Sequence, residues 1–310
     1  MILCAGESLI DLIGEEGKGI KQSEYFKPRI GGSPLNVVIG LSRLGKNVAF
    51  LTKVGNDYFG KKIIDFLIEE KVKSDYIFVS NSKKTPLAFV ALSKDKVPEY
   101  EFYRENTADL DITNKDIQNV ILNEIEIFHS GSISLIEGKT SESLINLFYL
   151  MKENNIVTSL DPNVRSNLIP NIREYKDKML EIMKMVDILK LSEEDLKFFL
   201  PNSSFEFFVE FLERKDKLTL LTLGENGSLA FFRGKIFKND AKKLGTIVDT
   251  TGCGDAYMAA ILFKLSQIGY SNLREDYLYD IMNFASTVAG IVATKYGGAS
   301  SMPRKKDLKV

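Results

Sequence analysis

Short apolar runs alternate with longer segments of helical period along most of this chain, and this alternation restricts its fold more than any other feature. Runs typical of buried strands occur at residues 48–54, 124–130, 156–160, 187–191 and 218–223. Segments with apolar residues at helical spacing lie near residues 57–67, 141–154, 173–186 and 205–214. Repeated strand–helix units predict an α/β fold, in which helices cover both faces of a mostly parallel central sheet. Ligands of such folds bind beyond the carboxyl ends of the strands.

Two regions depart from this alternation. Segments 87–93 and 99–104 look like paired extended strands, and the region 10–31 is also short on helical period. We expect a small β lid, formed by residues 10–31 and 86–108. Because no long linker or low-complexity tract separates the pieces, we expect the lid to be embedded in a single domain that spans residues 1–310.

Composition excludes several classes of protein. The 310 residues are 44% hydrophobic, enough to bury a large core, while 41 basic and 42 acidic side chains leave no electrostatic footprint for nucleic acid. The two cysteines, Cys4 and Cys253, are far apart and form no pattern typical of disulfide frameworks or zinc sites. No apolar run approaches membrane-spanning length and no leader pattern is present, so we expect a cytoplasmic protein that binds neither membrane nor nucleic acid.

The sequence Asp249-Thr250-Thr251-Gly252-Cys253-Gly254-Asp255 leads directly into an apolar, helix-forming run at residues 256–262. Glycines at the start of a helix let backbone N–H groups converge on an anion. A carboxylate at Asp255 would repel a bound phosphate unless it takes a proton from the group that attacks that phosphate. The motif therefore indicates phosphoryl transfer to a hydroxyl.

A second glycine motif, Gly31-Gly32-Ser33-Pro34-Leu35-Asn36, begins another apolar helix. We expect Ser33 as its N-cap, Pro34 at the first helical position and Gly45 just past its end. A well-capped helix would explain these residues without any ligand. Asn36 adds a polar amide to the first turn of an apolar helix, where it could hydrogen-bond a polyol.

Two strand ends carry further polar residues. The sequence Asp161-Pro162-Asn163-Val164-Arg165 follows the strand 156–160, and an Asx turn accounts for its first residues but not for Arg165, which could meet a sugar oxygen or a phosphate. Residues 222–227 follow another strand. They are either a simple turn or a place where glycines let adenine or ribose lie against the backbone.

Other chemistries find less support. His129 is the only histidine and is expected to be structural, so a Ser-His-Asp relay and a paired-histidine metal site are both disfavoured. The chain has no P-loop pattern, and no dinucleotide fingerprint follows its first strand. The acidic run Glu193-Glu194-Asp195 is expected to be the solvated first turn of a helix after Ser192, close to the proposed site.

Together these motifs resemble the ribokinase-like sugar kinases of the phosphofructokinase B type, most closely the bacterial fructokinases. The resemblance runs nearly end to end, and the 249–255 motif is its most specific signature. Further matching segments are residues 6–11, 54–60, 102–104, 128–135 and 295–299. The resemblance implies a ribokinase-like three-layer fold with a small β-sheet lid.

The resemblance also implies roles for individual residues. Asp255 would be the catalytic base, which deprotonates a sugar hydroxyl as it attacks the γ-phosphate of ATP. Backbone N–H groups of Gly252, Cys253 and Gly254 would form the anion hole. The positions that match the sugar site are Asp11, Gly32, Asn36, Tyr103, Arg104 and Arg165, with Tyr103 at the apolar face of the sugar.

On the nucleotide side, the matching positions are Asn163, Lys190, Ser192, Thr222, Gly224 and Gly227. Mg²⁺ would accompany ATP, with Asp195 in its water network. Relatives often hold a monovalent cation such as K⁺ near the positions of Asp249, Thr251, Gly297 and Ser301.

The chain departs from the family pattern at three places. Asp195 stands where the family usually has a glutamate three residues after Asn or Ser, so its carboxylate is one methylene shorter. Ala285-Ser286-Thr287 replaces a common Ala-Asn-Ala, which removes an amide contact expected near adenine. Cys253 replaces the commoner alanine, a small change because the expected contact comes from its backbone.

These observations predict an ATP-dependent kinase that phosphorylates a primary hydroxyl of a hexose, fructose to fructose 6-phosphate. Within the class, a 2-keto-3-deoxygluconate kinase or a ribokinase-type pentose kinase remains open, since two arginines near one site suit a carboxylate as well as neutral hydroxyls. Outside it, a sugar- or nucleotide-binding regulator without catalysis and a nicotinamide-dependent oxidoreductase remain open. We also expect a homodimer formed through the lid, because a second copy would cover the lid's apolar edge strands.

Overall fold

A computed structural model describes residues 1–92 and 98–308 of the chain. Within them, nine strands form one sheet in the order β13-β12-β11-β10-β9-β8-β1-β4-β5. These strands are β1 (Ile2–Ala5), β4 (Val48–Gly55), β5 (Ile77–Ser80), β8 (Ile127–Gly131), β9 (Val157–Asp161), β10 (Ile188–Ser192), β11 (Leu218–Thr222), β12 (Ser228–Phe232) and β13 (Lys235–Asn239). Every neighbouring pair from β11 to β5 is parallel, and the two pairs β11–β12 and β12–β13 are antiparallel. The expected mostly parallel sheet is confirmed.

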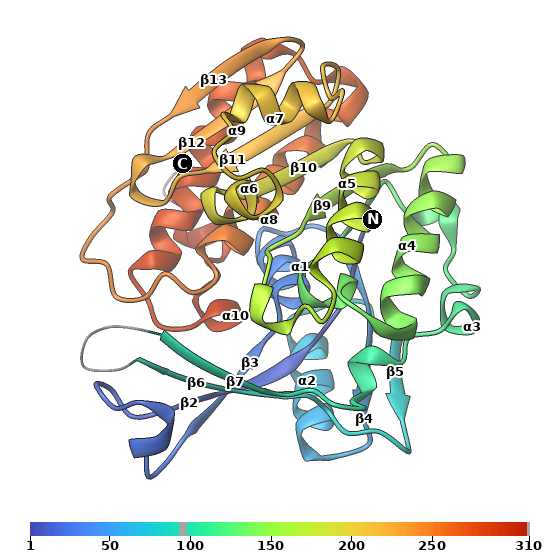
Figure 1. Cartoon of the computed structure of the whole chain (residues 1–310), viewed down its shortest axis with the longest axis vertical. Coiled ribbons are helices and arrows are strands. Elements are labelled where there is room, and N and C mark those ends of the chain that lie inside the picture. The colour runs from blue at the N-terminus through green and yellow to red at the C-terminus, as the bar shows by residue number, and fades with distance from the viewer. Residues whose placement is uncertain (93–97, 309–310) are drawn as a thin grey trace.

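Helices cover both faces of this sheet (Figure 1). One face carries α1 (Ser33–Arg43), α2 (Tyr58–Glu69), α8 (Cys253–Ile268) and α9 (Glu275–Ala293), and the other carries α4 (Gly138–Glu153), α5 (Ile172–Met185), α6 (Glu193–Phe199) and α7 (Phe205–Phe211). Alternate side chains of each buried strand pack into opposite cores. In β1, Cys4 contacts the first core and Leu3 the second, which explains why the strands appear as continuous apolar runs in the sequence.

A separate four-stranded sheet forms the lid, in the order β3-β2-β6-β7. Its strands are β2 (Leu9–Ile13), β3 (Lys27–Gly31), β6 (Leu87–Leu92) and β7 (Pro98–Tyr103). The antiparallel pairing of β6 with β7 confirms the expected extended pair, while residues 93–97 between them lie outside the described residues. Figure 1 shows the lid lying across one end of the main body, where α1 and the short α10 (Gly298–Ser301) also lie.

The helix that follows the 31–36 motif begins differently from the prediction. Gly32, with φ +114°, is the N-cap of α1, so Ser33 is the first helical residue and the prediction of Ser33 as N-cap is wrong. The end of the helix is as predicted. Gly45 has φ +95°, its N–H donates to Ser42, and the N–H of Lys46 donates to Leu41, which completes a Schellman motif.

The single histidine has the structural role that the sequence predicts. His129 bonds Ser159 at 3.0 Å inside the sheet, and burial lowers its pKa to about 3, so it stays neutral. Cys4 and Cys253 are both free thiols. Across residues 1–92 and 98–308, the helices all lack the length and apolar content needed to cross a membrane.

Candidate active site

A cavity of about 630 Å³ lies at the carboxyl ends of the central strands, with the lid as one of its walls. Five strand ends each contribute lining residues: Glu7 after β1, Ser132 after β8, Arg165 after β9, Glu194 after β10 and Gly224 after β11. The lid adds side chains that include Asp11, Val90 and Phe102, and the start of α8 supplies Thr250–Asp255. The cavity therefore lies at the edge of the sheet where strand–helix alternation predicts a ligand site.

The start of α8 forms an anion-binding geometry. Gly252 adopts the left-handed conformation, with φ +81° and ψ −1°, and a Cβ there would lie 2.9 Å from the Cα of Gly298. The N–H of Cys253 donates to the Thr250 carbonyl, whereas the N–H groups of Gly252 and Gly254 have no acceptor among the described residues. A sixteen-residue helix thus presents unpaired N–H groups to the cavity. The Cys253 thiol instead lies toward Ala289 of α9, 3.6 Å from its carbonyl oxygen.

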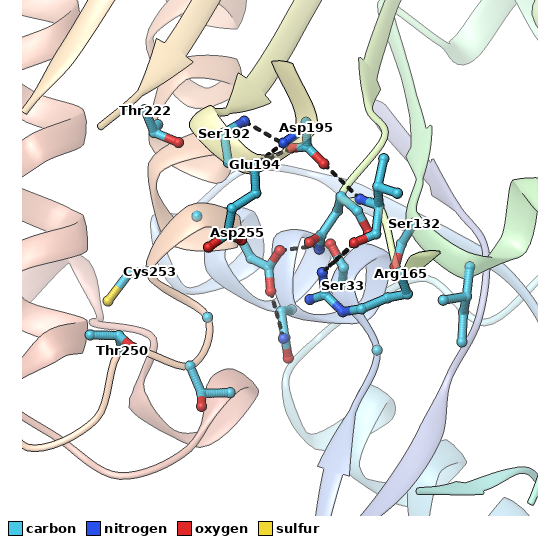
Figure 2. Close-up of a pocket in the computed structure, with 18 of the residues that line it drawn as sticks. Ser33, Ser132, Arg165, Ser192, Glu194, Asp195, Thr222, Thr250, Cys253 and Asp255 are labelled. Carbon is cyan, nitrogen blue, oxygen red and sulfur yellow. Dashed lines mark hydrogen bonds between the residues drawn. The ribbon is translucent and has the colours of Figure 1, made fainter. Parts of the chain in front are cut away.

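Asp255 lies in the first turn of α8, only 6% exposed, and is held by the first turn of α1. One carboxylate oxygen accepts from the Ser33 hydroxyl at 2.6 Å, and the other accepts from the Asn36 amide at 2.7 Å (Figure 2). Asp255 also lines the cavity. Oδ1 of Asn36 is buried and has no hydrogen-bond partner in the described part of the chain. The sequence did not indicate Ser33 as a site residue, because its hydroxyl was expected to cap α1.

Lys190 adds positive charge beside the helix start. Its ammonium pairs with Asp161 at 2.7 Å, and a Cβ at Gly254 would lie 3.3 Å from it. Burial lowers the pKa of Lys190, but the carboxylates of Asp161, Asp195 and Asp255 outweigh burial and raise it overall. Lys190 is therefore a fixed cation next to the unpaired amides of α8.

On the lid side, Asp11 and Glu7 are poorly solvated carboxyl groups. Burial raises the pKa of Asp11 to about 7, although the positive charge of Arg165 opposes the shift and the charge of Glu7 adds to it. Glu7 accepts from the Ser33 backbone N–H at 3.2 Å and from the Ser134 hydroxyl, and burial raises its pKa as well. Sequence reasoning missed Glu7, whose place beneath the cavity depends on tertiary packing.

The helix start that follows β10 holds two acids in different settings. Asp195 forms a capping box with Ser192, and its second oxygen accepts from the Val164 N–H at 2.7 Å. Glu194 is exposed and extends into the cavity (Figure 2). The three acids form the first turn of a helix after Ser192, as expected, but only Glu193 and Glu194 are solvated, because Asp195 is buried by its bonds to Ser192 and Val164.

The structure brings most of the expected site residues to this one cavity. Those that line it are Asp11, Gly32, Asn36, Asn163, Arg165, Lys190, Ser192, Asp195, Thr222, Gly224, Thr251, Gly252, Cys253, Gly254 and Asp255. Six do not line it: Tyr103, Arg104, Gly227, Asp249, Gly297 and Ser301.

Tyr103 does not lie at the sugar side of the cavity, where it was expected. It is 61% exposed and packs on Phe89, with 5.2 Å between ring centroids, whereas Tyr100 and Phe102 line the cavity. Successive side chains of a strand point to opposite faces, so the expected aromatic contact moves from Tyr103 to its neighbour Phe102.

Arg104 and Gly227 also lie outside the cavity. Arg104 is buried and forms an ion pair with Asp109 at 2.6 Å. Burial raises the pKa of Glu7, and the positive charge of Arg104 opposes part of that rise. Its Nη2 atom has no hydrogen-bond partner among the described residues. Gly227 forms the turn before β12, where a Cβ would lie 2.1 Å from the Asn239 carbonyl oxygen. The backbone of this turn therefore requires a glycine at position 227.

Three of the four positions expected near a monovalent cation meet at one turn. Asp249 accepts from the N–H groups of Thr251 and Gly297, each at 2.9 Å. The hydroxyl of Ser301 donates to the Gly298 carbonyl at 2.8 Å instead. Within the described ranges, no group of three or more His, Cys, Asp or Glu side chains is arranged to hold a metal ion by itself.

Comparison with known proteins extends over the whole chain. The model of a family described as pfkB family carbohydrate kinase matches residues 1–305. Fructokinase-1 of Oryza sativa subsp. japonica is 32% identical over 314 residues, covering 99% of this chain and 96% of the relative. A sugar kinase of Pyrococcus horikoshii in complex with ATP aligns with a TM-score of 0.87 and 32% identity, covering 99% and 97% of the two chains. A fructokinase of Vibrio cholerae O395, in a form with bound fructose, ADP and calcium ion, aligns with a TM-score of 0.87 and 25% identity over 99% and 96%.

The raised pKa of Asp11 is testable by titration. We expect the Asp11 carboxyl to titrate near pH 7 in ¹³C NMR spectra, and its pKa to rise further in Arg165→Gln because the opposing positive charge is lost. Arg173→Gln, on the exposed start of α5, should leave the pKa unchanged. A titration near pH 4 in the unmodified protein would contradict this description. The same raised pKa predicts how stability depends on pH. Because the folded state favours protonated Asp11, the free energy of unfolding should fall as the pH rises from about 4 to 7. Asp11→Asn should remove that loss.

Proposed function

Because the chain belongs to the pfkB family of carbohydrate kinases, we propose that it transfers the γ-phosphate of ATP to the primary hydroxyl of fructose, forming fructose 6-phosphate. The observation that carries the proposal is the buried Asp255, oriented by Ser33 and Asn36 beside the unpaired amides of α8. The relatives named fructokinase, which match this chain over nearly its full length, support fructose as the acceptor.

In the proposed reaction, the fructose hydroxyl oxygen forms a bond to the γ-phosphorus while the bond from phosphorus to the ADP oxygen breaks. Asp255 accepts the hydroxyl proton. Charge that builds on the transferred group meets the N–H groups of Gly252 and Gly254 and the ammonium of Lys190. The N–H of Cys253, bonded to Thr250, would join them only if that turn opens.

The remaining cavity residues divide between the two substrates. We assign Asp11, Gly32, Asn36 and Arg165 to the sugar, where the unpartnered Oδ1 of Asn36 offers an acceptor for a hydroxyl. The proposed nucleotide contacts are Asn163, Lys190, Ser192, Thr222 and Gly224.

We propose Mg²⁺ as the metal that accompanies the nucleotide. The cavity fits such an ion because the acids at the start of α6, Glu193, Glu194 and Asp195, line it, and oxygen atoms are the ligands that Mg²⁺ prefers. When bound, the ion would neutralise charge on the phosphate oxygens. A monovalent cation would lie at the turn held by Asp249, outside the cavity, where this carboxylate already orders Thr251 and Gly297.

A kinase for 2-keto-3-deoxygluconate is the alternative within the family. Such an acid needs cationic partners for its carboxylate, and Arg165 lines the cavity. Arg104, the second arginine expected there, is instead ion-paired with Asp109 and lies outside the lining. This geometry favours a neutral sugar over a sugar acid.

We further propose that the lid is an embedded part of one kinase domain and forms a homodimer contact. Phe26, Phe89 and Tyr103 make an aromatic cluster on the lid face opposite the cavity, with ring centroids 4.9 Å and 5.2 Å apart. Tyr103 is 61% exposed, and Phe26 and Phe89 are half-buried. A second copy of the lid would remove this surface from water.

The choice of sugar is tested by a substrate panel. Comparing kcat/KM for fructose, ribose, 2-keto-3-deoxygluconate and adenosine with ATP should give the highest value for fructose. A higher value for the sugar acid would replace fructokinase by the alternative. Phosphorylation of none of the four, despite ATP binding, would favour a binding protein.

The role of Asp255 is tested by Asp255→Asn. The amide cannot accept the hydroxyl proton, so kcat should fall by roughly 10²–10⁴ while the thermal unfolding temperature changes little. Asp280→Asn, on the exposed side of α9, provides the matched control and should retain normal turnover. Near-normal turnover by Asp255→Asn would falsify its assignment as the base.

The dimer is tested by Tyr103→Asp, which places a charge in the aromatic cluster. Light scattering should report a dimer for the unmodified protein at micromolar concentration and a monomer for the variant. Tyr58→Asp, on a side chain that is 90% exposed at the start of α2, should remain dimeric. A monomeric unmodified protein would contradict the proposal.

A further inference from the structure

Arg43, the last helical residue of α1, binds the segment of chain that includes α10. Its Nη1 group donates to the carbonyl oxygens of Ala299, Ser300 and Met302, at 3.0, 3.1 and 2.7 Å. These carbonyls belong to α10 and to the residue after it, which together we call the 298–302 segment. A helix leaves its last carbonyls without helical partners, and here one guanidinium group binds them. Arg43 thereby attaches the 298–302 segment to the carboxyl end of α1.

Glu70 fixes the direction of this guanidinium group. Its carboxylate, at the C-cap of α2, accepts from Nε and Nη2 of Arg43 at 3.0 and 2.7 Å, and the two side chains are only 10% and 7% exposed. Arg304 donates to the same carboxylate at 3.0 Å, but its side chain is 51% exposed. Burial would raise the pKa of Glu70, but Arg43 and Arg304 outweigh burial and lower it, so the carboxylate is ionised. With Nε and Nη2 bound to Glu70, Nη1 is left to face the 298–302 segment.

The face of α1 that carries Arg43 also carries Asn36. Residues 36, 40 and 43 are spaced by four and three positions, so they share one face of the helix. On this face Gly40 lies against α8, where an added Cβ would lie 2.7 Å from the Cβ of Ala259. Ala259 follows Asp255 by one helical turn. The contact between α1 and α8 therefore begins at the bond from Asn36 to Asp255 and continues toward Arg43.

The same segment lies against this face of α1 at both of its ends. At its start, a Cβ added to Gly298 would lie 2.6 Å from the amide nitrogen of Asn36. At its end, Met302 is 2% exposed, and its sulfur would lie 3.4 Å from a Cβ added to Gly40. The position of the segment therefore limits where the Asn36 amide can lie, and this amide donates to Asp255 at 2.7 Å.

We propose that Arg43 is a positioning residue for Asp255. By holding the 298–302 segment against α1, it keeps the Asn36 amide where it directs the carboxylate. Arg43 does not line the cavity, so its effect on the reaction passes through Gly298 and Asn36. Without the guanidinium group, the segment would shift, the amide would move with it, and the carboxylate would turn from the direction that proton transfer needs. This role rests on the proposed kinase function.

The first test is Arg43→Gln in the full chain, assayed with fructose and ATP. The kcat should fall roughly 10- to 100-fold, because a base that is displaced by a fraction of an ångström transfers protons poorly. The KM for ATP should stay within about twofold, since the proposed nucleotide contacts Lys190 and Thr222 belong to β10 and β11. Calorimetric titration with ADP counts the chains that bind nucleotide, so that kcat is expressed per folded site.

Two further variants separate positioning from stability. Arg304→Gln is the matched control, because Arg304 shares the Glu70 carboxylate but, among the described residues, donates to no carbonyl of the 298–302 segment. Its kcat should stay within about twofold of normal. Arg43→Lys keeps a charged donor for the carbonyls but loses the fork that pairs with Glu70. It should recover kcat to within about threefold of normal while its unfolding temperature stays lowered, whereas a purely stabilising residue would lose both together.

A double-mutant comparison identifies the group on which Arg43 acts. In the Asp255→Asn background, Arg43→Gln should lower the remaining kcat by less than about twofold, because the carboxylate that it positions is already absent. Arg43→Lys is measured in both backgrounds as well, so the comparison stands even where Arg43→Gln fails to fold.

The outcomes distinguish this role from the proposed function. Equal factors of loss in both backgrounds, a normal kcat for Arg43→Gln, or an equal loss in Arg304→Gln would each overturn the positioning role and leave the kinase proposal standing. If the unmodified protein phosphorylates no sugar, or if Asp255→Asn retains normal turnover, the proposed function or its base fails first, and the role of Arg43 fails with it.

Discussion

Two hydrogen bonds to Asp255 connect segments that are more than two hundred residues apart, and the arrangement of the site depends on them. Ser33 and Asn36 belong to the first turn of α1, and Asp255 to the first turn of α8, with separations of 222 and 219 residues. Both helices direct their positive ends toward this carboxylate. Asp255 therefore lies between two helix starts, and its two hydrogen bonds fix its direction before any ligand binds, as electrostatic preorganisation requires.

Glycines make this meeting of helices sterically feasible. A Cβ at Gly298 would lie 2.6 Å from the Asn36 amide nitrogen, and one at Gly252 would lie 2.9 Å from the Cα of Gly298. The start of α10 therefore packs between the two helix starts and holds the Asn36 amide against Asp255. A side chain at either glycine would push α1 from α8 and lengthen the bonds that orient the carboxylate.

Sequence patterns predicted the sheet, the lid and the cavity edge because these depend on local periodicity and on the rule that parallel strands end together. The 249–255 motif likewise has a local cause, the conformation of Gly252. The errors concern side chains whose partners are distant in sequence. The Ser33 hydroxyl bonds Asp255 instead of capping α1, and Tyr103 lies one residue out of phase with the cavity face of β7. No local pattern encodes such partners.

The cavity carries more acidic than basic side chains, yet a nucleotide triphosphate must enter it. The structure resolves this conflict residue by residue. Asp195 and Asp255 have donors on both oxygens, and Asp161 is paired with Lys190, so their charge is already compensated by protein groups. Asp11, with its pKa raised to about 7, is partly protonated near neutrality. An incoming phosphate therefore meets the amides of α8 and the Lys190 ammonium first. Glu193 and Glu194 also line the cavity and form no hydrogen bond or ion pair among the described residues, so a metal-bound nucleotide is favoured over the free anion.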